Sequence, residues 1–335
     1  MSLRSFVGAT INHVCWLEWI KLNWYLNMFK KYISKLIILI LFIFLPFTSY
    51  AWNYTGHVII AQIAYNNLTP SAKQKADILA NIIYDHLPSY QQNMLANYYP
   101  SASTFAKIAE LPDVWRNDNL LQIFLNNGAL PPWHLLAYSL VPSKGLHFAN
   151  LPYPQTSQCQ DFEPFNVVWG INQFESVFKT TNSQNAQAVL MVLEEHYIGD
   201  IHQPLHTISR YNAMCVNDEG GNDFCLKYNY YNGRCSKNLH QLWDSAVGYI
   251  REYNDIQETA TELQQSFPQN LFVAELNDNN PRDWATANYA YADFIYGLNE
   301  GQKPSSRYYS QGQKIAEKQL ALAGYRLAKV LNAEF

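Results

Sequence analysis

Histidine and aspartate residues recur four positions apart in two predicted helices, and this spacing constrains the fold more than any other feature. His196 precedes Asp200, and His240 precedes Asp244. Residues four apart on a helix lie on the same face about one turn apart, so each pair presents an imidazole and a carboxylate together. His206 follows closely after the first pair. Such a set, brought together by the fold, is what a hydrolytic site with several zinc ions requires.

The N-terminal region does not resemble folded protein. From Met28 it runs as a basic segment, MFKKYISK, an apolar stretch, LIILILFIFLPF, and the ending TSYA. This order is that of a secretory signal peptide, and the apolar stretch is shorter than the about 20 residues of a membrane span. We predict cleavage after Ala51, so that residues 1–51 are a signal-peptide region and Trp52 becomes the first residue. The upstream 27 residues do not fit this pattern, which favours Met28 as the true start; an uncleaved N-terminal anchor is the alternative.

The predicted mature chain, residues 52–335, is acidic. Residues 1–51 hold five of the 23 Lys/Arg and one of the 27 Asp/Glu, so 18 basic and 26 acidic side chains remain, a formal net charge of −8. Such a chain lacks the broad basic field of a protein that binds duplex DNA. If it handles phosphates, bound metal ions are the candidate source of attraction.

Four cysteines lie in the predicted mature chain, and an even number in an exported protein indicates two disulfides. Cys225 and Cys235 flank the segment KYNYYNGR, whose Asn-Gly step is typical of a tight hairpin turn. Three pairings are open, and we favour Cys225–Cys235 together with Cys159–Cys215. Zinc binding by these cysteines is disfavoured, because the sequence has no C-x-x-C pair.

Helical periodicity dominates the predicted mature chain, so we predict a mainly α fold in a single domain with a short β-hairpin and long loops. Thr69, Ser183 and Asn238 stand where helix N-caps are expected. Strand signals are confined to about 223–231, and Pro- and aromatic-rich loops such as 128–165 separate the helices. The predicted helices span 54–67, 70–87, 101–117, 164–180, 186–200, 239–253 and 306–333.

Three motifs carry a resemblance to a known family: EEHYIGDIHQPLH, GGND at 220–223 and NLHQLWD at 238–244. They are similar to the zinc-dependent single-strand-specific nucleases of fungi and plants, also called type I nucleases or 3′-nucleotidases. That family shares a superfamily with the zinc-dependent phospholipases C. The resemblance covers nearly the whole predicted mature chain, and it implies the helical fold of that superfamily. It also implies a chain that begins with tryptophan, as cleavage before Trp52 would produce.

The resemblance implies a site with three zinc ions. Asp200 would bridge two of them, and Trp52 would bind through its free amino group and its carbonyl oxygen. The implied ligands are Asp113, His147, His196 and Asp200 for the first ion, His206, His240 and Asp244 for the second, and Trp52, His57 and Asp200 for the third.

One histidine of the first ion has two candidates. LHFANLPY places His147 before Phe148 and Asn150, as in the family's pattern of His, an aromatic residue, any residue and Asp or Asn, followed by Pro. PPWHLLAY offers His134, whose separation from Asp113 along the sequence is closer to that usual in the family. However, Ala137 stands where the pattern has a polar residue. We favour His147.

Further roles follow from the same resemblance. Asp200, Arg116 and Asn150 would be catalytic, and Arg116 would lie near the scissile phosphate, although LPDVWR departs from the family's Trp-Ala-Asp segment. Phe148 would stack on a base, with a packing aromatic as the alternative, and Asn222 would contact phosphate or base, with a turn residue as the alternative. We interpret the two remaining histidines as non-ligands; these are His86 and His202.

The implied activity is hydrolysis of phosphodiester bonds in single-stranded DNA and RNA, which leaves a 5′-phosphate and a free 3′-hydroxyl. Zinc would activate water and neutralise the phosphate oxygens, and a recessed site beside an aromatic ring favours splayed bases over stacked duplex. The partner would be single-stranded nucleic acid or a nucleotide, with no stable protein partner. We expect an exported protein, periplasmic or secreted, that is not an integral membrane protein after processing.

Two other functions remain open. A zinc-dependent phospholipase C uses a similar metal cluster, but GGN before NLHQLWD and aspartate at position 244 favour the nuclease branch. A non-catalytic zinc-binding protein built on the same cluster is the second alternative.

Overall fold

The computed structural model describes residues 52–335 except 156–157, 160–162, 228–229, 232–233 and 252–254. The predicted signal-peptide region therefore lies outside the described residues.

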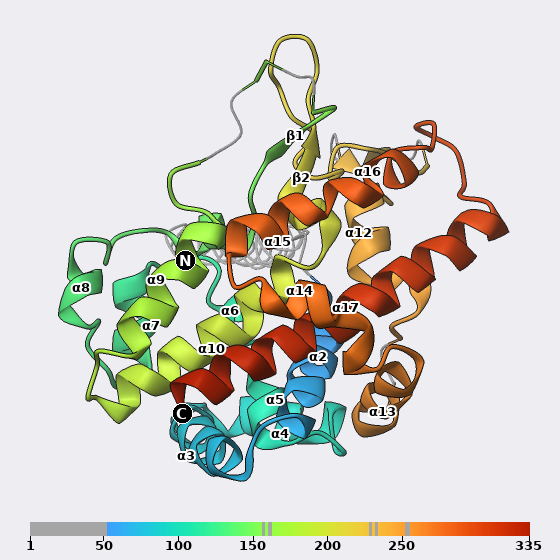
Figure 1. Cartoon of the computed structure of the whole chain (residues 1–335). Coiled ribbons are helices and arrows are strands. Elements are labelled where there is room, and N and C mark those ends of the chain that lie inside the picture. The colour runs from blue at the N-terminus through green and yellow to red at the C-terminus, as the bar shows by residue number, and fades with distance from the viewer. Residues whose placement is uncertain (1–51, 156–157, 160–162, 228–229, 232–233, 252–254) are drawn as a thin grey trace, which may run out of the picture. The chain divides into compact units, whose positions relative to one another are not determined.

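Helices predominate, so the prediction of a mainly α fold is confirmed (Figure 1). The α-helices are α2 (Tyr54–Asn66), α3 (Pro70–His86), α4 (Ser89–Tyr98), α5 (Thr104–Ile108), α6 (Leu111–Val114), α7 (Leu120–Asn126), α8 (Trp133–Leu136), α9 (Val167–Phe178), α10 (Gln184–Asp200), α11 (Pro204–Thr207), α12 (Leu239–Asp244), α13 (Ile256–Ser266), α14 (Val273–Asn277), α15 (Pro281–Ala287), α16 (Tyr289–Ile295) and α17 (Ser306–Glu334). Short 3-10 helices are η1 (Ser143–His147), η2 (Ala246–Gly248) and η3 (Gln269–Phe272).

Side-chain caps begin the helices at the positions that the sequence predicted. Thr69 Oγ1 accepts a hydrogen bond from the Ala72 N–H at 3.2 Å and starts α3. Ser183 does the same for α10 and Asn238 for α12. An N-cap oxygen satisfies one of the four N–H groups that a helix leaves without an internal partner, so these caps define where the helices start.

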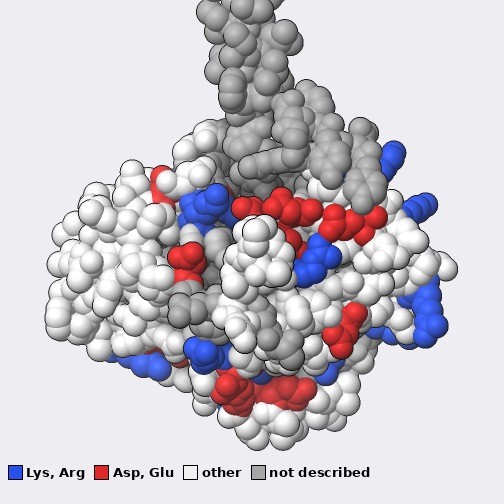
Figure 2. Space-filling model, turned by 90° about the horizontal axis from the view of Figure 1, so that it is seen from above, with Lys and Arg blue, Asp and Glu red and all other residues white. Residues whose placement is uncertain are grey.

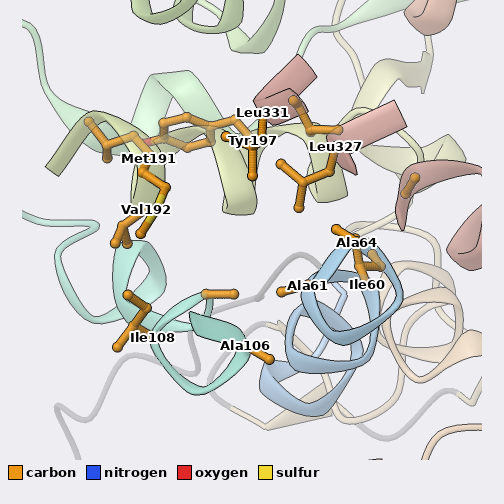
Figure 3. Packing of buried hydrophobic residues seen from close by; sticks show 14 of the residues in the cluster. Ile60, Ala61, Ala64, Ala106, Ile108, Met191, Val192, Tyr197, Leu327 and Leu331 are labelled. Carbon is orange, nitrogen blue, oxygen red and sulfur yellow. The ribbon is translucent and has the colours of Figure 1, made fainter. Parts of the chain in front are cut away.

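Helix α10 lies in the core of the molecule. Its side chains are buried on all sides along most of its length, from Ala186 to Asp200, as expected for a helix enclosed by other elements. It packs against α2, α3, α9 and α17, and Figure 3 shows side chains from α2, α5, α10 and α17 converging in this region. A Cβ at Gly324 of α17 would lie 2.5 Å from an Ile63 side-chain atom of α2, so glycine permits the close approach of these two helices.

Two small sheets accompany the helices. Strand β1 (Leu151–Tyr153) pairs in parallel with β2 (Ile208–Arg210), and β3 (Tyr230–Tyr231) pairs antiparallel with β4 (Arg234–Cys235). The β3–β4 pair confirms the predicted hairpin, whose two turn residues lie outside the described residues. Both predicted disulfides, Cys159–Cys215 and Cys225–Cys235, are confirmed.

Three sequence predictions about the elements are wrong. The predicted helix 239–253 ends at Asp244, because Ala246 and Val247 take left-handed backbone conformations with φ of 49° and 56°. The predicted helix 101–117 is split into α5 and α6, and Pro112 falls in the first turn of α6. Strands are not confined to 223–231, since β1 and β2 lie elsewhere; at three residues each they are too short to show an alternating pattern.

Across the part of the chain that the structure describes, none of the helices combines the length and apolar character that a membrane span requires.

Candidate metal centre

Three groups of histidine and aspartate side chains gather in the interior, each with its ligand atoms within 4.8 Å of one another. We call them the first, second and third group, and every member is buried. The first group is Asp113, His147 and His196; the second is His206, His240 and Asp244; the third is His57, His196 and Asp200.

Asp200, a member of the third group, also faces the first group. Its Oδ2 is 3.0 Å from His147 Nδ1 and 3.4 Å from His196 Nε2, while its Oδ1 is 3.3 Å from His57 Nε2. The rings of His57 and His196 stack with centroids 3.7 Å apart, which brings His196 into the third group as well. One carboxylate with its two oxygens facing two groups has the geometry of a bridging ligand.

The two His–Asp pairs come from helices that the fold brings together. His196 and Asp200 occupy the last turn of α10, and His240 and Asp244 lie on α12, each pair with the four-residue spacing that the sequence showed. Gly199 makes room for His57, because a Cβ there would lie 2.8 Å from His57 Nδ1. The N–H of Asn53 donates to the Asp244 carbonyl at 2.9 Å, which anchors the start of the described chain beside the cluster.

Backbone carbonyls set the orientation of three imidazoles. His196 Nδ1 bonds the Ala109 carbonyl at 2.9 Å, His206 Nδ1 bonds that of His147 at 2.7 Å, and His240 Nδ1 bonds that of Gly220 at 2.8 Å. A carbonyl only accepts, so each Nδ1 carries the proton and each Nε2 presents a lone pair to its group. Such outer bonds fix metal-binding histidines in the tautomer that a metal needs.

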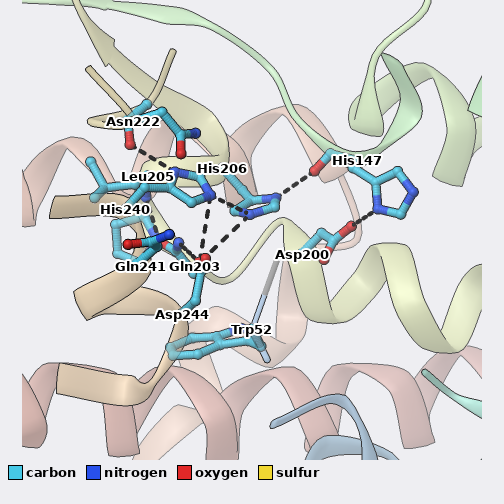
Figure 4. Close-up of polar contacts among 12 residues, drawn as sticks. Trp52, His147, Asp200, Gln203, Leu205, His206, Asn222, His240, Gln241 and Asp244 are labelled. Atoms are coloured by element: carbon cyan, nitrogen blue, oxygen red, sulfur yellow. Dashed lines mark hydrogen bonds and ion pairs between the residues drawn. The ribbon is translucent and has the colours of Figure 1, made fainter. Parts of the chain in front are cut away.

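The donor set fits metal ions. In the second group, His206 Nε2 and His240 Nε2 face each other at 3.1 Å, although each presents a lone pair (Figure 4). Within the described residues, both carboxylate oxygens of Asp113 and Oδ1 of Asp200 are buried without a hydrogen-bond partner. Buried carboxylates and opposed lone pairs are unfavourable unless a cation lies between them. Imidazole and carboxylate ligands of this kind suit zinc.

In the three groups, burial shifts the pKa of each histidine and aspartate in the direction that favours the neutral side chain. The pKa of His196 falls to about 3 and that of His240 to about 4, chiefly because burial disfavours the charged imidazolium. Burial raises the pKa of Asp113 to about 8, against the opposing effect of the Arg116 charge. The pKa values of Asp200 and Asp244 are likewise raised by burial. In the metal-free protein, these shifts favour neutral imidazoles and a protonated Asp113 carboxyl at neutral pH.

Metal uptake at pH 7 is expected to release protons. The lowered pKa values leave the histidines neutral, so they have no proton to lose; the raised pKa of Asp113 leaves its carboxyl protonated, and a metal ion must displace that proton. Calorimetric titration of metal-free protein with zinc, in buffers of different ionisation enthalpy, should show release of about one proton or more. Asp113→Asn should lower that number, and identical heats in all buffers would contradict the prediction.

The other predicted site residues lie around this cluster in different ways. The charge of Arg116, which is half-buried, acts on Asp113, Asp200 and Asp244. Phe148 directly follows His147 and is half-buried. Trp52 is fully buried, its indole N–H donates to the Gly199 carbonyl at 3.0 Å, and it lies beside Asp244 in Figure 4.

The side chains of Asn150 and Asn222 form hydrogen bonds with residues that belong to none of the three groups. Asn150 Oδ1 accepts from the Ser209 hydroxyl at 2.7 Å. The Asn222 amide donates to the Glu219 carbonyl at 2.8 Å, after which Gly220 and Gly221 take positive φ values, so Asn222 has the contacts expected of a turn residue.

The three remaining histidines lie outside the three groups of the described chain. On α8, the ring of His134 contacts the ring of Trp133 at a tilt of 37°, and Trp133 is 73% exposed. His86 Nδ1 bonds the Ile82 carbonyl at 2.6 Å. His202 is buried, but both ring nitrogens are engaged, Nδ1 with the Ile198 carbonyl and Nε2 with the Arg326 guanidinium.

Sequence reasoning missed one residue that contacts the cluster. Gln203 is fully buried, and its amide bonds the Asp244 carboxylate at 2.7 Å. The available signal was the position of Gln203 in GDIHQPLH, between Asp200 and His206. Neither periodicity nor residue type connects Gln203 to Asp244, which lies 41 positions later.

The chain is similar to known nucleases. The model of the S1/P1 Nuclease family matches residues 52–335. Endonuclease 1 of Arabidopsis thaliana is 21% identical over 313 residues, which cover 85% of this chain and 87% of that protein. Endonuclease 2 of the same plant is 26% identical over 222 residues, 58% of this chain and 72% of that protein. Endonuclease 3 is 27% identical over 236 residues, 62% of this chain and 72% of that protein.

Proposed function

This chain belongs to the S1/P1 nuclease family, and on that premise we propose that it is an exported, zinc-dependent endonuclease and 3′-nucleotidase. As a family member it is a hydrolytic phosphodiesterase that acts on nucleic acid. The proposed substrates are single-stranded DNA and RNA, and the proposed products carry a 5′-phosphate. The family match also favours the nuclease branch over a phospholipase C.

The observation that carries the proposal is that His196 belongs to both the first and the third group, while the two oxygens of Asp200 face His147 of the first group and His57 of the third. Each of the three groups could hold a metal ion, which supports a proposal of three zinc ions. The first ion would be held by Asp113, His147, His196 and Asp200, the second by His206, His240 and Asp244, and the third by Trp52, His57 and Asp200. When bound, the zinc ions would supply an activated water at neutral pH and positive charge for the phosphate oxygens.

The chain's own residues would then orient the substrate. Asp200 would hold two ions at a set spacing through its two oxygens. The charge of the Arg116 guanidinium acts on the carboxylates of the cluster, which supports the proposal that Arg116 contacts a phosphate bound there. Phe148 is the proposed stacking platform for a base, Asn222 a proposed contact with phosphate or base, and Asn150 a proposed catalytic residue.

The surface charge supports the proposal that the metal-loaded cluster, rather than a basic face of the protein, attracts the negatively charged substrate. On the face seen in Figure 2, Lys and Arg side chains are scattered among acidic and uncharged ones and form no continuous basic field. A bound cluster of three dications would exceed the charge of its three carboxylates and so create a local positive site in an otherwise acidic chain.

The direct test is zinc content together with activity of the processed protein. We expect about three zinc ions per chain, release of acid-soluble nucleotides from denatured DNA faster than from duplex, and release of phosphate from a 3′-nucleotide. Liberation of phosphocholine from phosphatidylcholine without nuclease activity would instead support a phospholipase C. Zinc binding without turnover on any phosphodiester would support the non-catalytic alternative.

Processing before Trp52 is expected to be required for full activity. The family match begins at Trp52, and the indole and the Asn53 N–H fix this end of the chain against Gly199 and Asp244. Only cleavage after Ala51 would create an amino group there to bind the third ion. Mass spectrometry of the exported protein should find Trp52 at its N-terminus. A form with extra residues before Trp52 should lose most activity and about one zinc ion; full activity in that form would contradict the assignment.

Export itself is proposed from two features. The signal-peptide pattern ends where the family match begins, and the two disulfides fit an oxidising compartment. The chain would accordingly act in the periplasm or outside the cell.

A further inference from the structure

The side chain of Gln203 is fixed at both ends in the interior. It is fully buried, its Nε2 donates to Asp244 Oδ1 at 2.7 Å, and its Oε1 accepts from the Leu205 N–H at 2.6 Å. Figure 4 shows the amide of Gln203 directed at Asp244. Because both amide atoms have partners, the carboxamide has one orientation and holds the Asp244 carboxylate in one position.

The oxygen that Gln203 contacts is the one that faces the second group. Asp244 Oδ1 lies 3.5 Å from His240 Nε2 and 3.9 Å from His206 Nε2. A carboxylate oxygen accepts more than one bond, so an amide N–H on one side leaves a lone pair for a cation on the other. The bond from Gln203 therefore aims Asp244 at the point where the two imidazoles converge.

The turn that carries Gln203 has its own supports. Asn288 donates to the Ile201 carbonyl and to the Thr207 hydroxyl, each at 2.9 Å. Gln319 donates to the His202 carbonyl at 3.1 Å. These bonds come from other elements and hold the segment between Asp200 and His206 without the Gln203 side chain. Loss of that side chain should thus affect Asp244 more than the turn.

Building on the proposed function, we propose that Gln203 is a positioning residue that sets the zinc affinity of the second group selectively. It acts through Asp244 and touches neither substrate nor the proposed ions. Residues that orient a metal ligand typically contribute about 10- to 100-fold to metal affinity. The first and third groups do not include Asp244, so their affinity should be preserved.

The test compares Gln203→Met with Gln62→Met. Methionine keeps the length of the side chain but removes the amide. Gln62 is a matched control, since it is also buried, its Nε2 donates to Asn66 Oδ1 and Gln257 Oε1, and its Oε1 accepts from the Ser103 N–H. Zinc ions per chain are counted by native mass spectrometry during titration with a chelator. The melting temperature of the metal-free proteins shows whether both variants fold.

We expect Gln203→Met to lose one ion at a chelator concentration about 10- to 100-fold lower than wild type and to keep the other two. Excess zinc should restore its turnover, because all proposed ligands remain. Gln62→Met should retain three ions like wild type. If Gln203→Met does not fold, Gln203→Asn, which keeps an amide but shortens its reach, should show the same selective loss.

Retention of all three ions with wild-type affinity in the Gln203 variants would overturn the inference, and so would equal loss of all three. A wild-type protein that binds no zinc would refute the proposed function and this inference with it. A wild-type protein with three ions and unaltered Gln203 variants would refute the inference alone.

Discussion

Asp200→Asn is expected to strip zinc from the protein and to lower turnover on single-stranded DNA by at least about 10- to 100-fold. The two oxygens of Asp200 face His147, His196 and His57 at 3.0 to 3.4 Å. Asparagine keeps the size but removes a negative charge and turns an amide nitrogen, which only donates, toward one of the proposed ions. Zinc per chain and turnover measured on the same preparation check the prediction.

Asp218→Asn is the matched control for that substitution. Asp218 is also a buried aspartate, but it accepts from the Arg210 N–H and the Tyr296 hydroxyl and belongs to none of the three groups. Its variant should change stability while zinc content and turnover stay near wild type. Normal zinc content and turnover in Asp200→Asn would mean that Asp200 does not bridge two ions.

His147→Ala is expected to lower the zinc content by about one ion and to abolish nearly all turnover on single-stranded DNA. His147 Nδ1 lies 3.0 Å from Asp200 Oδ2, 3.1 Å from His196 Nε2 and 3.9 Å from Asp113 Oδ1. Its removal takes one of four proposed ligands from a buried site whose carboxylates need a cation. Zinc per chain and turnover are the measurements.

His134→Ala provides the comparison, since His134 is the other candidate from sequence. It lies on α8 against the ring of an exposed tryptophan, so its loss should change the free energy of unfolding by about 1 kcal/mol or less and leave zinc in place. The reverse result, zinc loss in His134→Ala and a tolerated His147→Ala, would move the ligand to the WHLLAY segment.

Phe148→Ala should have an effect on activity between those of His147→Ala and His134→Ala. Metal should be retained, because Phe148 offers no ligand atom, but substrate binding should weaken by roughly 1–3 kcal/mol if the ring stacks on a base. The Michaelis constants on single-stranded DNA and on a 3′-nucleotide measure this effect. Unchanged constants would leave Phe148 as a packing residue.

Helix starts were predictable from the sequence because their causes are local. Thr69, Ser183 and Asn238 each cap a helix through a bond to a backbone N–H three residues on. Helix ends were less predictable: the helix that begins after Asn238 ends at Asp244, although apolar residues continue beyond it. Its end depends on left-handed backbone at Ala246 and Val247, which residue type does not favour.

The amino-acid sequence by itself determined the two His–Asp pairs, since residues four apart on one helix must share a face whatever surrounds them. His196 with Asp200 and His240 with Asp244 are therefore readable before any fold is known. Only the tertiary structure decided that His57 stacks on His196 and that Gln203 bonds Asp244. Those contacts join segments 139 and 41 positions apart, and their geometry depends on how helices pack, which no local spacing encodes.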